Sequence, residues 1–276
     1  MKSKHLLDIK SLSKEELLAF VSEAQTFIEV SERSIKKVPA LRGKTILNVF
    51  LEDSTRTRVS FEIAGKRLSA DTINISGSGS SISKGETLLD TARTLQAMRP
   101  DVIVIRHRAS GAAHFLAQRL SSTAVVNAGD GMNEHPTQAL LDLLSLQQHF
   151  GKSLQELPKL KVAIVGDIRH SRVARSNVWA HLLLGNEVRL VGPPGLVPEF
   201  LRDEECFGER VAIHSRLESG IEGADVVMVL RMQKERQKDS YIGSLDEYSR
   251  FYGVSLPKID QHCPGALILH PGPANR

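Results

Sequence analysis

The stretch TILNVFLEDSTRTRVSFEIAGKRL, residues 45–68, decides the fold class because its hydrophobic period changes in the middle. Residues 46–51 form the short apolar run of a buried parallel strand, and the residues after Asp53 follow a helical period. A strand that leads directly into a helix is the repeating unit of α/β proteins. The helical pattern places on one face Val59, Ile63 and either Arg67 or Leu68.

The first turn of this helix carries an unusual charge. Ser54 and Thr55 are good N-cap residues, yet Arg56 and Arg58 follow them where the helix dipole favours acidic side chains. A bound anion resolves the conflict, because backbone N–H groups, hydroxyls such as that of Thr57, and guanidinium groups all donate to a phosphate. The alternative is an ordinary surface helix whose arginines reach solvent or the acidic residues 52 and 53.

The alternation of strand and helix continues along the chain. Ser13 and Glu16 form a capping box before an N-terminal helix, and a long helix begins at Pro136 and ends at Gly151. Strands are predicted at residues 71–76, 101–105, 122–128, 160–167, 186–193, 224–231 and 266–273, and further helices at residues 87–100 and 171–185. We therefore predict an α/β protein of two doubly wound parallel-sheet domains, residues 1–150 and 151–276, with the active site in the cleft between them.

The composition is that of an ordinary globular protein and argues against several functions. Of the 276 residues, 41% are hydrophobic, and no apolar run approaches the roughly 18 residues of a membrane span. The net charge of +4 is scattered and aromatic residues make up 5%, which argues against nucleic acid as a partner. Two distant cysteines and the lack of a signal sequence indicate a cytoplasmic protein. The residues after Gly166, DIRH, lack the glycines of a dinucleotide site, so we expect no such cofactor. The two cysteines do not have the spacing of metal ligands, so we expect no metal.

Candidate ligand-binding residues gather where the predicted strands end. In open α/β sheets, ligands bind beyond the carboxyl ends of the strands. The donors at those positions are Ser54 to Thr57, Arg106, His135 with Gln138, Arg169, Arg231 with Gln233, and the loop from His270 to Pro273. Each alone is more often a solvated or structural residue, but their shared position makes the set informative. A site with many donors and no evident nucleophile suits substrates that carry a phosphate and carboxylates and react through positioning and electrostatic stabilisation.

Several short motifs resemble one protein family. STRTR at 54–58, KGE at 84–86, HPTQ at 135–138, GD at 166–167 with Arg169, RMQ at 231–233 and HPGP at 270–273 occur in the order seen in the transcarbamoylases. The resemblance spans nearly the whole chain. STRTR and HPxQ are common to the aspartate and ornithine branches of that family, whereas the aspartate branch is indicated by Lys84, Arg169, Arg231 and Gln233.

The resemblance implies an activity and a binding site for the first substrate. The expected reaction transfers the carbamoyl group of carbamoyl phosphate to the amine of L-aspartate, a step of de novo pyrimidine synthesis. The phosphate is expected to bind to Ser54, Thr55, Arg56, Thr57 and Arg106. The carbonyl oxygen is expected to be polarised by Thr57, Arg106 and His135, with Gln138 at the carbamoyl NH2 group.

The resemblance also implies a site for the acceptor. The two carboxylates of L-aspartate are expected to bind Lys84, Arg169, Arg231 and Gln233, and backbone carbonyls at Pro271 and Gly272 orient the attacking amine. The proton leaves with the phosphate, so no side chain is assigned as general base.

Assembly is the last property that the resemblance implies. In the family, Ser80 and Lys84 come from the neighbouring subunit, which makes a catalytic homotrimer the minimum active unit. Such trimers can join regulatory or dihydroorotase-type chains in larger assemblies. The family chain also continues after the HPGP loop with a helix that the 276 residues do not include.

Alternatives to this interpretation differ in substrate or in class. The acceptor could be another amine, such as ornithine or an N-acyl amino acid. The chain could also be a non-catalytic homologue that binds phosphate or supports an assembly. The run RMQKERQKDSY, residues 231–241, resembles a substrate-binding loop of the aspartate branch but could equally be a solvated charged segment.

Overall fold

The computed structural model describes residues 3–77, 86–233 and 241–272, and the chain divides into two compact units. Unit 1 consists of Met1–Ser11 and Ala19–Thr137, and unit 2 consists of Leu12–Leu18 and Gln138–Arg276. Each unit contains a parallel sheet with helices, which confirms the predicted fold class.

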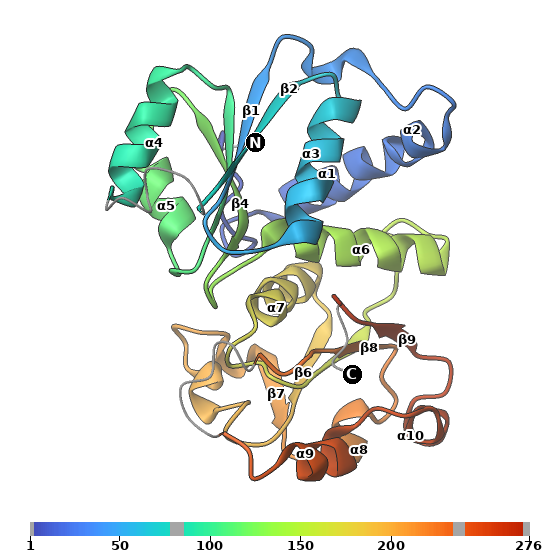
Figure 1. Cartoon of the computed structure of the whole chain (residues 1–276). Helices are drawn as coiled ribbons and strands as arrows, with labels where there is room; N and C mark the ends of the chain where they lie inside the picture. The colour runs from blue at the N-terminus through green and yellow to red at the C-terminus, as the bar shows by residue number, and fades with distance from the viewer. Residues whose placement is uncertain (1–2, 78–85, 234–240, 273–276) are drawn as a thin grey trace. The chain divides into compact units, whose positions relative to one another are not determined.

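Unit 1 is built on a parallel sheet with the strand order β2-β1-β3-β4, of which Figure 1 labels β1, β2 and β4. Its strands are β1 (Thr45–Phe50), β2 (Asp71–Ser76), β3 (Val102–His107) and β4 (Ala124–Asp130). Its helices are α2 (Ile28–Glu32), η1 (Pro39–Leu41), α3 (Thr55–Arg67), α4 (Leu88–Ala97) and α5 (Ala112–Ala117), and the longer α1 (Lys14–Thr26) starts in residues of unit 2. The predicted capping box is present at α1, because the Ser13 N–H donates to Glu16 and the Glu16 N–H donates to Ser13.

Strand β1 divides the core of unit 1 into two layers. Leu47 and Val49 pack into a cluster with residues of α4 and α5, whereas Ile46 and Phe50 pack into a second cluster that includes Phe61 of α3. Figure 1 shows the same arrangement, with α4 and α5 on one face of the sheet and α3 on the other. Because successive side chains of a strand point to opposite faces, a continuous apolar run is buried on both sides.

Helix α3 forms where the sequence predicts it, but its apolar stripe faces outward. Val59 is 39% exposed and Ile63 is 42% exposed, while the buried residue of the helix is Gly65. A Cβ atom at Gly65 would lie 2.4 Å from the Oγ1 atom of Thr72 in β2, so the helix can lie this close to the sheet only because the residue has no side chain. The close approach sets which face is inward, and the hydrophobic period alone does not reveal it.

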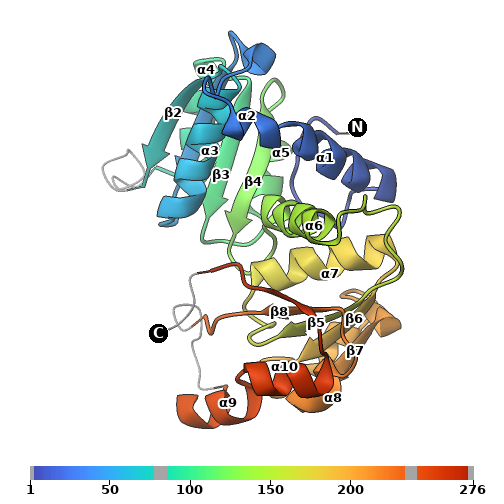
Figure 2. The same cartoon turned by 90° about the vertical axis from the view of Figure 1, so that its right-hand side faces the viewer.

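Unit 2 has a second parallel sheet with the order β7-β6-β5-β8-β9. Its strands are β5 (Lys161–Val165), β6 (Glu187–Val191), β7 (Val211–His214), β8 (Val226–Val229) and β9 (Leu267–Leu269). Helical segments are η3 (Glu199–Arg202), η4 (Gly208–Arg210), α7 (Arg172–Leu184), α8 (Leu217–Ile221), α9 (Leu245–Tyr252) and α10 (Leu256–His262), and α6 (Pro136–Phe150) enters this unit from unit 1. Figure 2 shows α7 on one side of this sheet and α8, α9 and α10 on the other.

The described residues contain no helix that is long and apolar enough to cross a membrane.

Candidate active site

The N-terminus of α3 is open to a ligand. Ser54, at the N-cap, has an extended backbone, but its side chain accepts no hydrogen bond from the first turn. That turn contains no acidic residue, and Thr55 and Arg56 are exposed. The first backbone N–H groups of a helix have no partner within the helix, so this turn offers several donors together with positive charge.

Arg106, at the end of β3, is held beside this turn by three contacts. It is 9% exposed, and its Nη2 atom donates to Oε1 of Glu52 at 2.9 Å. Its Nη1 atom donates to the carbonyl oxygen of Ala128 at 3.2 Å and lies 3.5 Å from Oγ1 of Thr57. The structure therefore brings together Thr57 and Arg106 as the sequence predicts, and Glu52 serves to anchor Arg106.

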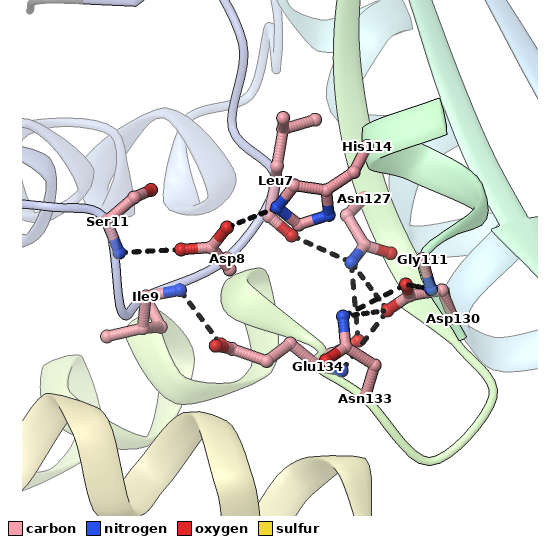
Figure 3. Close-up of polar contacts among 10 residues, drawn as sticks. All are labelled: Leu7, Asp8, Ile9, Ser11, Gly111, His114, Asn127, Asp130, Asn133 and Glu134. Carbon is pink, nitrogen blue, oxygen red and sulfur yellow. Dashed lines mark hydrogen bonds and ion pairs between the residues drawn. The ribbon is translucent and has the colours of Figure 1, made fainter. Parts of the chain in front are cut away.

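A network of buried polar groups shapes the loop that leads to His135. The Asp130 carboxylate accepts hydrogen bonds from the Asn127 and Asn133 side chains and from the backbone N–H of Glu134 (Figure 3). The Glu134 carboxylate accepts the backbone N–H of Ile9 at 2.8 Å. These contacts connect the loop to β4 and to the N-terminal segment, and sequence reasoning did not identify either acid as important.

The N-terminal segment that reaches this loop is itself anchored. The Asp8 carboxylate contacts Nε2 of His114 at 2.6 Å and accepts the backbone N–H of Ser11 (Figure 3). The hydrogen bond with Asp8 raises the pKa of His114. Burial works to raise the pKa of Asp8, but the hydrogen bonds with His114 and Ser11 lower it overall. His135 itself is buried, and its Nδ1 atom lies 3.3 Å from Oγ1 of Thr137.

Gln138 lies one turn before a buried carboxylate on α6. Its Nε2 atom donates to Oδ1 of Asp142 at 2.9 Å, and Nδ2 of Asn177 on α7 donates to Oδ2 of Asp142 at 2.8 Å. Burial raises the pKa of Asp142 to about 6, against the opposing effect of the hydrogen bonds from Asn177 and Gln138. An aspartate within the apolar run LLDLL is the signal by which the sequence could have marked this position.

Asp167 joins the ends of two neighbouring strands of unit 2. It is fully buried after β5, and its Oδ1 atom contacts Nδ1 of His170 at 2.7 Å. Its Oδ2 atom accepts the backbone N–H of Gln233, which follows β8, at 3.1 Å. The side-chain oxygen of Gln233 in turn accepts a hydrogen bond from Nη2 of Arg231 at 3.3 Å. The predicted pair of Arg231 and Gln233 is thus held at the carboxyl edge of the sheet.

The two arginines after β5 have different surroundings. The guanidinium of Arg169 lies over the ring of Tyr241, 4.8 Å from its centroid, and 5.9 Å from that of Phe200. Arg172, the first residue of α7, is only 3% exposed. A buried guanidinium at a strand-to-helix turn is a strong candidate for carboxylate binding, and sequence reasoning missed it because it considered only Arg169 at this edge.

The remaining predicted residues lie at the end of the chain or outside the described residues. Pro271 and Gly272 follow β9, where the backbone N–H of Gly272 donates to Nδ1 of His270 at 2.7 Å. The predicted Ser80 and Lys84 lie in residues 78–85, outside the part of the chain that the structure describes. Most of the predicted substrate loop, residues 234–240, also lies outside it.

The fold and these residues define an α/β protein whose parallel strands present donors for anionic substrates at their carboxyl ends. Family models agree with this class. The carbamoyl phosphate-binding domain of aspartate/ornithine carbamoyltransferases matches residues 4–148, and the aspartate/ornithine-binding domain matches residues 158–276. The chain belongs to the aspartate/ornithine carbamoyltransferase family.

Individual relatives are similar over almost the whole chain. The aspartate carbamoyltransferase catalytic subunit of Magnetococcus marinus is 53% identical, with 99% of this chain and 82% of the relative covered. That of Syntrophotalea carbinolica is 55% identical, with 99% and 84% covered. Among solved structures, aspartate transcarbamoylase from Trypanosoma cruzi in complex with carbamoyl phosphate and aspartate has a TM-score of 0.83 at 28% identity, with 98% of this chain and 86% of that chain covered.

Proposed function

We propose that this chain catalyses transfer of the carbamoyl group from carbamoyl phosphate to L-aspartate, giving N-carbamoyl-L-aspartate and phosphate for de novo pyrimidine synthesis. The observation that carries the proposal is identity above 50%, over almost the whole chain, to catalytic subunits named for this reaction. The open first turn of α3 and the anchored Arg106 support it chemically.

Carbamoyl phosphate binds to unit 1 in this proposal. The phosphate accepts hydrogen bonds from the first turn of α3, through backbone N–H groups and the side chains of Ser54, Thr55, Arg56 and Thr57, and from Arg106. The carbonyl oxygen is polarised by Thr57, Arg106 and His135, and these groups stabilise the negative charge of the tetrahedral intermediate. Arg106 is suited to this task because Glu52 and Ala128 fix its position before substrate arrives.

L-Aspartate binds through its carboxylates to Arg169, Arg231, Gln233 and Lys84, with Arg172 as a further donor. Its amine nitrogen attacks the carbamoyl carbon, the carbon–oxygen bond to phosphate then breaks, and the amine proton leaves with the phosphate. Backbone carbonyls near Pro271 and Gly272 orient the amine. Binding and positioning supply the catalysis, and no covalent enzyme intermediate forms.

The active assembly in this proposal is a homotrimer in which Ser80 and Lys84 act in the neighbouring subunit's site. Val59 and Ile63 of α3 are 39% and 42% exposed, and a contact between chains that covers this pair is part of the proposal. Sedimentation of the wild type and of Ile63→Asp tests it. We expect a trimer for the wild type and smaller species for the variant, and a wild-type monomer would contradict it.

The cytoplasm is the proposed location. Cys206 and Cys263 are both free thiols, which supports a reducing compartment.

The decisive experiment measures ureido product from carbamoyl phosphate with L-aspartate and with L-ornithine in parallel. Product with aspartate alone is the expected result. Product with ornithine alone would overturn the choice of acceptor, and no product with either would favour a non-catalytic homologue. The Arg231→Ala variant sharpens the test, since it should weaken use of aspartate far more than binding of carbamoyl phosphate.

A further inference from the structure

Asp142 is a buried carboxylate in direct contact with a side chain of the proposed site. Gln138 and Asp142 are four residues apart on α6 and therefore lie on the same face of the helix. Asp142 is 7% exposed, and its second partner, Asn177 of α7, is fully buried. All three residues belong to unit 2, so their contacts lie within one compact body.

An ionised carboxylate only accepts hydrogen bonds, and this fixes the direction of any amide beside it. The NH2 end of Gln138 donates to Oδ1 of Asp142 at 2.9 Å, which turns the amide oxygen Oε1 away from the carboxylate. No described residue donates a hydrogen bond to that oxygen. The opposite amide orientation would place two oxygen acceptors against each other. The contact therefore leaves Gln138 with an acceptor available to a ligand.

Asn177 reinforces the arrangement from the other side. Its NH2 group donates to Oδ2 of Asp142 at 2.8 Å and to the carbonyl oxygen of Val173 at 3.1 Å. Its own oxygen, Oδ1, is buried and has no hydrogen-bond partner. An orphaned buried acceptor is costly, and the contact with the Asp142 carboxylate explains why the amide keeps this orientation.

We propose that Asp142 is a positioning residue for recognition of the carbamoyl group. It holds the NH2 end of Gln138, so that Oε1 of Gln138 accepts a hydrogen bond from the NH2 group of carbamoyl phosphate. The inference rests on the proposed function, which assigns Gln138 to that group. It also gives the site a preference for an acyl phosphate that carries a donor, since a methyl group in place of NH2 cannot donate.

The test compares carbamoyl phosphate with acetyl phosphate, which has a methyl group where carbamoyl phosphate has NH2. Dissociation constants for both are measured at pH 8 on the wild type, Asp142→Leu, Gln138→Leu and the double variant. We expect Asp142→Leu to weaken carbamoyl phosphate binding roughly tenfold. This is the expected effect of losing the hydrogen bond between the ligand NH2 group and Gln138, whose amide is no longer held in the right direction. Binding of acetyl phosphate should stay within about twofold, and the double variant should resemble Gln138→Leu.

Two results would overturn the positioning role of Asp142 and leave the proposed reaction unaffected. Equal weakening of both ligands by Asp142→Leu would mean general structural damage, and unchanged binding of carbamoyl phosphate would mean that Asp142 does not act through Gln138. A third result tests the assignment of Gln138 to the carbamoyl NH2 group, on which the role of Asp142 depends. If Gln138→Leu leaves carbamoyl phosphate binding unchanged, the assigned role of Gln138 is wrong, and the positioning role is overturned with it.

Two further variants keep the test informative if Asp142→Leu does not fold. Asp142→Asn keeps one acceptor for Gln138 and can donate to Oδ1 of Asn177, so we expect a smaller loss, confined to carbamoyl phosphate. Asn177→Leu is the matched control, because it disturbs the same buried cluster without touching Gln138. It should lower thermal stability but preserve the preference for carbamoyl over acetyl phosphate, and loss of that preference would overturn the proposal.

Discussion

Helices α3 and α7 begin in equivalent ways but differ in the hydrogen bonds made by their first turns. Each follows an interior strand of its sheet, and each has a serine at the N-cap and an arginine in the first turn. The side chain of Ser54 accepts no hydrogen bond from α3, whereas Oγ of Ser171 accepts the backbone N–H of Ala174 at 3.1 Å. Arg56 is exposed, but Arg172 is buried.

The difference indicates which kind of anion each helix start can bind. An uncapped turn offers several backbone donors and hydroxyls around one point, which matches the many oxygens of a phosphate. The cap of α7 already occupies the backbone N–H of Ala174, so fewer backbone donors remain there, and the buried guanidinium of Arg172 matches a carboxylate. The proposed function therefore assigns the phosphate to the start of α3 and the acceptor carboxylates to the start of α7.

The largest expected effect comes from Arg106, whose guanidinium lies beside the first turn of α3. Replacement of Arg106 by methionine removes a donor for both the phosphate and the developing oxyanion, and we expect kcat to fall by about 10²- to 10³-fold. Steady-state kinetics with aspartate measures this. The matched control is Arg67→Met at the far end of α3, where the guanidinium contacts Ser31, and it should retain activity. A loss below fivefold in Arg106→Met would remove the main support for a phosphate site at α3.

A buried histidine on α7, His181, predicts that the stability of the protein depends on pH. His181 is fully buried, Nδ2 of Asn186 contacts its Nδ1 atom at 3.0 Å, and desolvation lowers its pKa to about 4. At His181, the unfolded state therefore binds more protons than the folded state between about pH 4 and pH 6.5. The stabilising contribution of neutral His181 is complete above pH 6.5 and is lost as pH falls toward 4, by about 3 kcal/mol in total.

Urea unfolding at pH 7 and pH 4.5, at one protein concentration, checks this dependence. The wild type should lose roughly 2 kcal/mol more between the two pH values than His181→Asn, whose side-chain oxygen can replace Nδ1 as an acceptor. Equal losses in the two proteins would show that His181 is not held neutral, and the contrast between the two helices would then rest on their first turns alone.

Arg172→Met tests whether the capped turn of α7 binds the acceptor. We expect KM for aspartate to rise about tenfold or more, because a charge-assisted hydrogen bond contributes about 1.5–3 kcal/mol. Carbamoyl phosphate binding should be nearly unchanged. Arg169→Met is the comparison, since its guanidinium already lies over Tyr241 and should matter less. A loss of stability without a change in KM would assign Arg172 a structural role.

The smallest expected effects come from the two N-cap serines and test the comparison most directly. Ser171→Ala removes an existing cap and should lower the free energy of unfolding by about 1 kcal/mol. Ser54→Ala removes no cap, so it should leave stability nearly unchanged while weakening carbamoyl phosphate binding severalfold. Thermal unfolding and ligand titration of both variants measure this. Equal destabilisation by the two substitutions would show that α3 is capped like α7.

Much of the fold followed from local pattern, and the exceptions are short or irregular elements. The period change at residues 45–68 correctly predicted β1 and α3, and Pro136 correctly predicted the start of α6. The local pattern did not reveal α5, β7, α8, α9 and α10, which have four to eight residues each. Segments of that length contain too few turns or alternations for a hydrophobic period to stand out.

The sequence alone determined the order of the longer strands and helices and the clustering of donors at strand ends, because hydrophobic period, caps and turn residues act over a few neighbouring positions. Only the tertiary structure decided that Gly65 sets the inward face of α3, that Glu52 holds Arg106 and that Asp142 holds Gln138. Packing of a helix against a sheet depends on which residues, distant in sequence, become neighbours in the folded chain. The direction of a buried hydrogen bond depends on the same thing. That is set by packing in three dimensions and leaves no periodic signal in the chain.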